Sequence, residues 1–273
     1  MISVKKSLAL SRSRGDYEAE MYLSPSLALD FSWWLNRVPE GDNTIRTDSF
    51  QFKIYTDASK SAWGAYFNNQ TTFGFWSLEE KKRHINELEL LALFCGLKSF
   101  VSTFSNCNVL YRIDNTTAVC TVNRMGSVKY ENLNKLVREI WTWCRKRNIY
   151  IFASYITSKS NIHADRASRT THKETEWSLA NYAFEEITTT FDYPDIDLFA
   201  SRINTKCPKF VSWMRDLEAY KIDAFTLNWN LFYFYAFPPF SMVLRVMQKI
   251  ITDRAEGIVV IPLWTSQPWF PLF

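Results

Sequence analysis

The chain has 273 residues, of which 47% are hydrophobic and 16% aromatic; this excludes a disordered protein and allows one large domain or two modest ones. Lys and Arg exceed Asp and Glu by only 32 to 28, so the charge permits a polyanionic partner without requiring one. The five cysteines have no C-x-x-C spacing and only three histidines are present, which disfavours a zinc site and predicts a reducing compartment inside the cell, cytoplasm or nucleus.

The first predicted element is an amphipathic helix within residues 24–39. Ser24 is a suitable N-cap and Pro25 a suitable first helical residue, and apolar residues then recur at helical spacing up to Pro39. Turn-forming residues predict a linker over 40–49. Residues 1–49 are therefore expected to form a helical connecting segment that ends in a linker.

A mixed pattern of strands and helices follows over residues 50–190. Three strand-like runs predict an antiparallel meander at about 50–57, 62–68 and 71–76. The later helix and strand patterns lie at about 86–103, 108–114, 131–146, 148–156 and 174–187. A short helix after residue 114 is expected to end with Gly126 as its cap. The order βββαβαβα predicts an α/β layer.

The composition changes after residue 190, where turn residues, prolines and aromatics become frequent, so a second, smaller α/β region is expected over 191–273. Its uncharged run 224–244 has the length of a membrane span. However, Asn228, Asn230 and the pair Pro238-Pro239 would leave polar groups unsatisfied in lipid. The sequence therefore predicts a buried, aromatic-rich strand and turn there, and no membrane partner.

Four acidic residues stand at positions where they could meet. Asp57 and Asp114 each follow a predicted strand, and ligand sites gather at strand ends in open sheets. Glu89 shares a helical face with core residues, whereas Glu87 points elsewhere. Asp165 begins a helix after the fifth strand. Convergence of such like charges is costly unless a cation lies between them.

Each acid also has a structural explanation of its own. Asp57 could belong to a turn, Asp114 could cap a helix, and Asp165 could be a first-turn residue that the helix dipole favours. Glu89 could be a surface acid if the helical phase is shifted by one residue. Taken together, four carboxylates without cysteine or histidine predict a site for a hard cation, Mg²⁺ or Mn²⁺.

Motifs in the same order connect these acids to a known family. "YTDAS" with "WGAYF", then "ELELLAL", "RIDNTTAV" and "NIHADRASR", with spacings of 32, 25 and 51 residues between the acids, resemble the ribonuclease H domain of retroelement reverse transcriptases. "GDYEAEMYLSPSLALDFSWWL", "HINELELLAL" and "DNTTAVCTVNRMG" resemble the DIRS-type, tyrosine-recombinase retrotransposons. The resemblance implies a ribonuclease H-like mixed five-stranded sheet with flanking helices over 50–190.

The same resemblance implies a function. It places Asp57, Glu89, Asp114 and Asp165 in the family's four catalytic carboxylate positions, where two Mg²⁺ or Mn²⁺ ions assist hydrolysis of the RNA strand of an RNA–DNA hybrid. The chain has "YITS" where many relatives have an "HIPG"-like run. His163 is then an auxiliary proton donor or a structural imidazole at the helix start, the second being favoured.

Substrate contacts are expected at backbone and 2′-hydroxyl groups rather than base edges. The candidates are Asn115, Thr116 and Thr117 after the fourth strand, and Arg145, Lys146 and Arg147 at a helix end. The basic cluster could equally be a solvated helix end that complements the helix dipole.

The whole chain is interpreted as part of a larger polyprotein. No Y-x-D-D run occurs, so a polymerase portion would be a separate partner. Residues 191–273 resemble a reduced adenine-N6 DNA methyltransferase, in which Phe237 replaces the polar residue of the D/N-P-P-Y/F motif and no glycine-rich loop for S-adenosylmethionine is present. A catalytically inactive nucleic-acid-binding remnant of a retroelement is the alternative interpretation.

Overall fold

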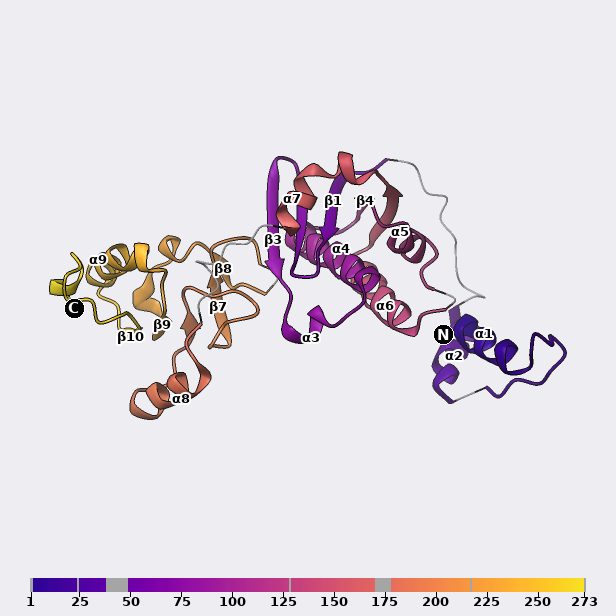
Figure 1. Cartoon of the computed structure of the whole chain (residues 1–273), viewed down its shortest axis with the longest axis horizontal. Coiled ribbons are helices and arrows are strands. Elements are labelled where there is room, and N and C mark those ends of the chain that lie inside the picture. The colour runs from indigo at the N-terminus through magenta and orange to yellow at the C-terminus, as the bar shows by residue number, and fades with distance from the viewer. Residues whose placement is uncertain are drawn as a thin grey trace.

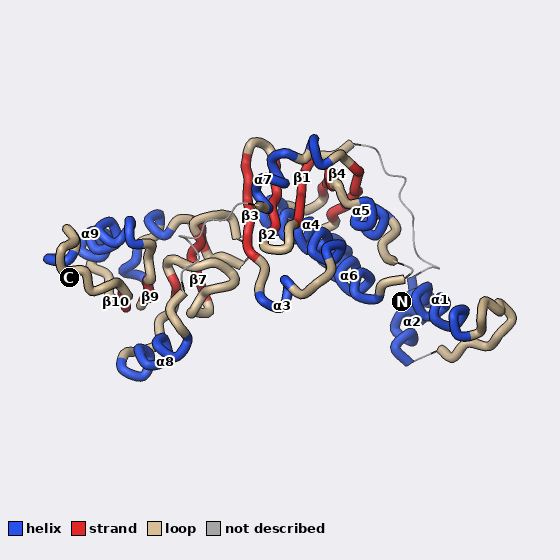
Figure 2. Tube along the Cα trace, in the orientation of Figure 1, coloured by secondary structure: helices blue, strands red, loops and turns tan. Residues whose placement is uncertain are grey.

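A computed structural model describes residues 2–23, 25–37, 49–127, 129–169, 178–216 and 218–272. The chain forms an elongated molecule in which a first sheet with its helices lies between two N-terminal helices and a second, smaller sheet (Figure 1). The tube view shows the same order, with the N-terminal helices and the C-terminal region at opposite ends (Figure 2).

The N-terminal segment contains α1 (Ile2–Arg12), the 3-10 turn η1 (Pro25–Leu27) and α2 (Ala28–Arg37). The predicted helix is therefore present, but its first turn at Pro25 is a 3-10 turn. The proposed cap Ser24 and most of the predicted linker, 40–48, lie outside the described residues.

The first sheet contains five strands in the order β3-β2-β1-β4-β5. Their bounds are β1 Phe52–Ala58, β2 Ala62–Phe67, β3 Gln70–Phe75, β4 Cys107–Ile113 and β5 Ile149–Tyr155. The first three pair antiparallel as the predicted meander, and β4 pairs parallel to both β1 and β5. β4 alternates strictly between buried and half-buried residues, so its two faces have different neighbours.

Helices cover one face of this sheet. These helices are α4 Ile85–Val101, α5 Thr116–Asn123 and α6 Glu131–Arg145, and the short α3 (Leu78–Lys81) precedes α4. The backbone of α4 approaches β1 and β2 closely at Gly96, where an added Cβ would lie 3.0 Å from side-chain atoms of Thr56 and Ala65. Leu88, Leu93 and Leu97 of α4 are fully buried in this core. The turn η3 (Ser158–Ser160) and the short α7 (Ile162–Ser168) follow β5.

One predicted helix end needs correction. The left-handed residue after α5 is Met125, with φ of 55°, rather than Gly126. The amide of Gly126 donates to the carbonyl of Thr121 at 2.9 Å, which closes the helix end. The glycine is needed for another reason, because an added Cβ would lie 2.7 Å from Oδ1 of Asn134.

The order βββαβαβα with strand order 3-2-1-4-5 defines a ribonuclease H-like fold for this unit. The ribonuclease H-like class that the motif resemblance implies is therefore confirmed, as is the order of elements predicted from the different hydrophobic periods of strands and helices. We call residues 49–169 the ribonuclease H-like unit and residues 178–272 the C-terminal unit.

The C-terminal unit is a smaller α/β structure around a second five-stranded sheet in the order β10-β9-β6-β7-β8. Its strands are short: β6 Ile196–Asp197, β7 Lys209–Ser212, β8 Lys221–Ile222, β9 Phe234–Ala236 and β10 Gly257–Val259. The described pairings are all parallel. The helices are α8 (Asn181–Thr190) and α9 (Val243–Asp253). Helix α8 falls within the stretch predicted for the first domain, yet its Phe184 packs with Tyr235 and Ile258 of the second sheet.

The aromatic run 224–244 consists of short elements. It holds the 3-10 turns η4 (Ala224–Thr226), η5 (Trp229–Leu231) and η6 (Phe240–Met242) around β9, and Trp229 and Phe234 are fully buried. A last turn, η7 (Phe270–Leu272), ends the described chain. Among the described helices, none has both the length and the apolar character needed to cross a bilayer.

Candidate active site

Three of the four predicted acids meet at one edge of the first sheet. Asp57 is near the end of β1 and Asp114 directly follows β4, and because these two strands are parallel neighbours their carboxyl ends lie together. Glu89 reaches the same place from the second turn of α4. One carboxylate oxygen from each of Asp57, Glu89 and Asp114 lies within 4.8 Å of the other two. We call these three residues the acid cluster.

The cluster is largely removed from solvent. Asp57 is 6% exposed and Glu89 is 4% exposed, while Asp114 is half-buried. Glu87, two residues from Glu89, lies outside the cluster, and its Oε1 accepts a long hydrogen bond of 3.4 Å from the side-chain amide of Asn132. The helical phase thus brings Glu89, and not Glu87, to the sheet.

Burial and mutual repulsion disfavour three charges in this place. Burial, followed by the charges of Asp57 and Asp114, raises the pKa of Glu89 to about 9. Burial also raises the pKa of Asp57, a hydrogen bond from Ser168 opposes that shift, and Asp114 and Asp165 add to it. A group of acids that repel one another in a buried site is stabilised when a cation neutralises them.

The donor set fits a hard divalent cation. Oε2 of Glu89 is buried and has no hydrogen-bond partner in the structure. Its lone pairs are therefore available to coordinate a cation. The three residues offer carboxylate oxygens only, the ligands that Mg²⁺ and Mn²⁺ prefer. The acid cluster can therefore hold such an ion.

Ser168 contacts the cluster, although it is not among the predicted site residues. Its hydroxyl donates a short hydrogen bond to Oδ2 of Asp57. Its carbonyl accepts a bond of 2.8 Å from the hydroxyl of Ser59, which ties the end of α7 to the turn after β1. The signal was present in "NIHADRASR", because Ser168 lies one helical turn after Asp165 and so shares its face.

Asp165 lies outside the acid cluster. Its Oδ1 forms an ion pair of 2.7 Å with Arg169, the C-cap residue of α7, and about a third of the Asp165 side chain is exposed. Its charge still contributes to the raised pKa of Asp57, so it belongs to the same neighbourhood. The structure therefore brings together three of the predicted ligands and leaves the fourth paired with Arg169.

The polar residues after β4 adjoin the cluster. Oδ1 of Asn115 caps α5 by accepting from the amide of Ala118 at 2.9 Å, and its Nδ2 donates to Oδ1 of Asn86 at 3.0 Å. Thr116 is exposed and Thr117 is half-buried. His163 is exposed and stacks on the ring of Tyr66, with centroids 4.3 Å apart, as a structural imidazole would.

The basic cluster Arg145, Lys146 and Arg147 lies at the opposite end of the sheet. The carbonyl of Arg147 accepts from the amide of Asn106 at 2.9 Å, and Asn106 precedes β4, whereas Asp114 follows it. The seven residues of β4 span roughly 23 Å. Arg147 stacks at 4.1 Å over the ring of Trp143. This separation from the acids could not be read from the sequence; it arises because α6 returns the chain to the start of the next parallel strand.

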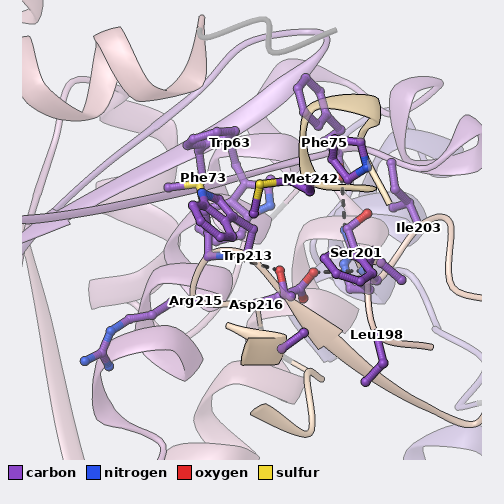
Figure 3. A pocket seen from close by; sticks show the side chains of 18 of the residues that line it. Trp63, Phe73, Phe75, Leu198, Ser201, Ile203, Trp213, Arg215, Asp216 and Met242 are labelled. Atoms are coloured by element: carbon purple, nitrogen blue, oxygen red, sulfur yellow. Dashed lines mark hydrogen bonds between the residues drawn. The ribbon is translucent and has the colours of Figure 1, made fainter. Parts of the chain in front are cut away.

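A cavity of about 420 Å³ lies elsewhere, between the two units (Figure 3). Its walls include Trp63, Phe73 and Phe75 from the first sheet and Trp213, Asp216 and Met242 from the C-terminal unit. None of the predicted site residues lines it. The acid cluster is thus a separate site at the edge of the sheet and not part of this cavity.

No protein-family model matches the chain, and no curated protein is significantly similar to it. Among solved structures, LC11-RNase H1 in complex with an RNA/DNA hybrid is similar over 43% of this chain and 93% of that one, with 18% identity and a TM-score of 0.37. RNase H1 from the archaeon Halobacterium salinarum is similar over 42% and 92%, with 12% identity and a TM-score of 0.35. A foamy viral protease-reverse transcriptase in complex with double-stranded DNA matches over 57% and 33%, with 12% identity and a TM-score of 0.28. Strand order and connections, rather than these low scores, define the fold.

Proposed function

We propose that this chain is a metal-dependent endoribonuclease that hydrolyses the RNA strand of RNA–DNA hybrids. The observation that carries the proposal is the acid cluster at the carboxyl edge of a ribonuclease H-like sheet. Asp57 would be the central ligand, Glu89 and Asp114 would complete the site of one divalent ion, and Asp165 would hold a second. The chemistry that two bound Mg²⁺ or Mn²⁺ ions supply to such a hydrolysis is activation of a water and stabilisation of the leaving 3′ oxygen.

Hydrogen bonds and packing hold the residues of this site in place in the free protein. Ser168 fixes one oxygen of Asp57, so that the other oxygen is left to face the cluster. Glu89 is held by the packed helix α4, which limits its motion. Asn115 and Asn86, hydrogen-bonded to each other, present polar groups beside the acids where a ribose hydroxyl could bind.

Asp165 must exchange its partner for the second ion to be held. In the structure Arg169 occupies its carboxylate, with an ion pair of 2.7 Å. This pairing, with "YITS" in place of an "HIPG"-like run, favours the alternative function, an inactive nucleic-acid-binding remnant. The two functions differ in one measurable respect, which is turnover.

The deciding experiment is cleavage of a hybrid whose RNA strand carries a 5′ label. The wild-type chain should cleave it with Mg²⁺ and stop when EDTA is added, and Asp57→Asn should abolish cleavage without changing the circular dichroism spectrum. Glu87→Gln is the matched control and should cleave like wild type. Unchanged cleavage by Asp57→Asn would contradict the proposal, and hybrid binding without any cleavage would favour the remnant.

We also propose that the chain derives from a DIRS-type retrotransposon polyprotein, acts inside the cell in cytoplasm or nucleus, and has the polymerase portion as a partner. The quoted motifs support this origin. For the C-terminal unit, the methyltransferase resemblance and the replacement by Phe237 support a packing role without methyl transfer. Calorimetric titration with S-adenosylmethionine should give no binding heat, and clear binding would refute the packing role.

A further inference from the structure

The first sheet has a second face that its helices leave partly open. Helices α4, α5 and α6 pack on the face that carries the buried residues Ile54, Val109 and Ile151. Alternate residues of the same strands point to the other face. There α7 covers β2 and the end of β1, held close by Gly64, and the described residues place no helix over β4 and β5.

Strand register arranges the residues of this open face in two neighbouring cross-strand rows. In the first row Tyr66 of β2 pairs with Tyr55 of β1, Tyr55 with Arg112 of β4, and Arg112 with Ser154 of β5. In the second row Lys53 pairs with Leu110, and Leu110 with Phe152. We call the two rows the open-face platform, which consists of Lys53, Tyr55, Tyr66, Leu110, Arg112, Phe152 and Ser154.

The rings of the platform are already ordered against one another. Tyr55 and Tyr66 are 5.9 Å apart edge to face, and Lys53 lies 5.8 Å above the ring of Tyr55. Phe152 stacks on Phe50 at 6.3 Å and remains 39% exposed. Pre-ordered aromatic rings that stay accessible lose little conformational entropy when a flat ligand stacks on them.

The platform also has an unsatisfied donor and no acid. Nη1 of Arg112 donates to the hydroxyl of Ser154 at 2.8 Å, but its Nε is buried without a partner. Together with Lys53, this guanidinium makes the two rows positively charged. A surface that combines aromatic faces with cations complements a ligand with planar rings and anionic groups.

The platform runs directly into the acid cluster. Asp57 lies two residues beyond Tyr55 on the same face of β1, and Asp114 lies two residues beyond Arg112 from β4. The next row along the strands is therefore the acidic one, at a step of roughly 7 Å. A polynucleotide that reaches the acids from the sheet side would pass over the two rows.

We propose that the open-face platform binds single-stranded nucleic acid. The partner is a single strand because bases can stack on the rings of a sheet only when they are not paired with another strand. This binding site goes beyond the hybrid cleavage proposed for the acids, and it does not require that the acids are active. Its affinity comes from stacking on Tyr55 and Phe152 and from phosphate contacts with Lys53 and Arg112.

The test titrates the full chain into a fluorescently labelled single strand of about 12 nucleotides, once as RNA and once as DNA, and measures the anisotropy of the label. EDTA is present so that cleavage cannot interfere. Phe152→Ser and Tyr55→Ser should each weaken binding about tenfold, because each removes one stacking ring. Lys53→Gln should lower the slope of log affinity against log salt by about 0.7. The matched controls are Tyr182→Ser, an exposed ring on α8, and Lys221→Gln, an exposed lysine on β8, and both should bind like wild type.

The proposal is overturned if the wild-type chain does not bind single strands at low salt, or if the platform variants bind as the controls do. It is also overturned if sedimentation shows that the platform joins two copies of the chain and that Phe152→Ser only makes it monomeric. Lys53→Gln alters an exposed side chain and should not affect folding. Its salt dependence therefore still tests the proposal if Phe152→Ser does not fold. A chain that binds single strands but never cleaves hybrids would keep this proposal and refute the proposed nuclease.

Discussion

The energetic cost of ionising Glu89 in its buried position indicates a role in binding a cation. A carboxylate that is 4% exposed, with a buried unpartnered oxygen and two acidic neighbours, destabilises the folded chain when it is ionised. Burial first, and then Asp57 and Asp114, raises its pKa to about 9. An ionised Glu in such a position needs a compensating positive charge, and a bound cation is the partner that its surroundings favour.

The pair Glu89→Gln and Glu87→Gln tests this role with two readouts. Glu89→Gln should lower hybrid cleavage at least about a hundredfold, because a neutral amide is a poor ligand for a divalent ion. It should also remove most of the rise in melting temperature that Mg²⁺ gives to wild type, since only the folded site binds the ion. Glu87→Gln should leave both quantities nearly unchanged. The reverse pattern would show that the other glutamate serves the site.

Ser168 gives a second prediction at the residue scale. Its hydroxyl donates a hydrogen bond to Oδ2 of Asp57, one of the ligands in the acid cluster. Ser168→Ala should therefore reduce cleavage about tenfold by freeing Asp57 to rotate, with little change in hybrid affinity. Titration of the activity with Mg²⁺ measures the effect as a higher metal requirement, and an unchanged Mg²⁺ dependence would refute it.

Among the elements, the contact between β2 and α7 decides the shape of the site. An added Cβ on Gly64 would lie 2.4 Å from the carbonyl of Ala164 and 2.5 Å from the amide of Ser168, both of them backbone atoms that cannot turn aside. Helix α7 carries both Ser168 and Asp165, so any shift of this helix moves two residues of the site at once.

Gly64→Ala should consequently destabilise the chain by about 2 kcal/mol through overpacking and lower cleavage as well. The control is Gly96→Ala on α4, where the added Cβ would meet side-chain carbons at 3.0 Å and alanine is the better helix former, so the two effects oppose each other. Thermal unfolding of both variants measures the difference. Equal stability of Gly64→Ala and wild type would show that α7 moves aside freely.

Across the whole molecule, a half-buried ion pair joins the two units. Arg202 of the C-terminal unit donates to both oxygens of Glu80, at 3.0 and 3.1 Å, and the two side chains are 19% and 17% exposed. Arg215 adds a bond of 3.4 Å to the carbonyl of Ser99, and its own carbonyl accepts from Thr72 at 2.7 Å. The C-terminal unit is thereby fastened beside β3, the edge strand of the first sheet.

Acid should weaken this junction. Burial by itself raises the pKa of Glu80, but hydrogen bonds from Arg202 and Ser77 outweigh it, and the net pKa is lowered. A lowered pKa in the folded chain stabilises it above the unfolded value of about 4.5, and this stability is lost as the pH falls through the folded value. Limited proteolysis between the units should therefore accelerate below about pH 4.5. In Arg202→Met, which should cost about 3 kcal/mol, the same acceleration should already be present at pH 7.

The elements between residues 50 and 156 could be predicted to within about two residues because their periods are long and distinct. β4 alternates over seven residues, and α4 keeps its apolar face over 17. The C-terminal sheet could not be predicted in this way, since strands of two to four residues are too short to show a period. Gly126 was misjudged because a glycine after a helix can provide either the left-handed residue or room for a neighbour.

By itself, the sequence determined the order of elements and the choice of Glu89 over Glu87, because these depend on local spacing along the chain, and the resemblance of its motifs implied the ribonuclease H-like class. Only the tertiary structure decided which acids meet, since Asp57 and Asp114 converge through the parallel pairing of β1 with β4. It also decided that Asp165 pairs with Arg169, that Ser168 orients Asp57, and that the basic cluster lies at the far end of β4. These relations join residues distant in sequence, and distances of that kind are set by packing and strand register rather than by local pattern.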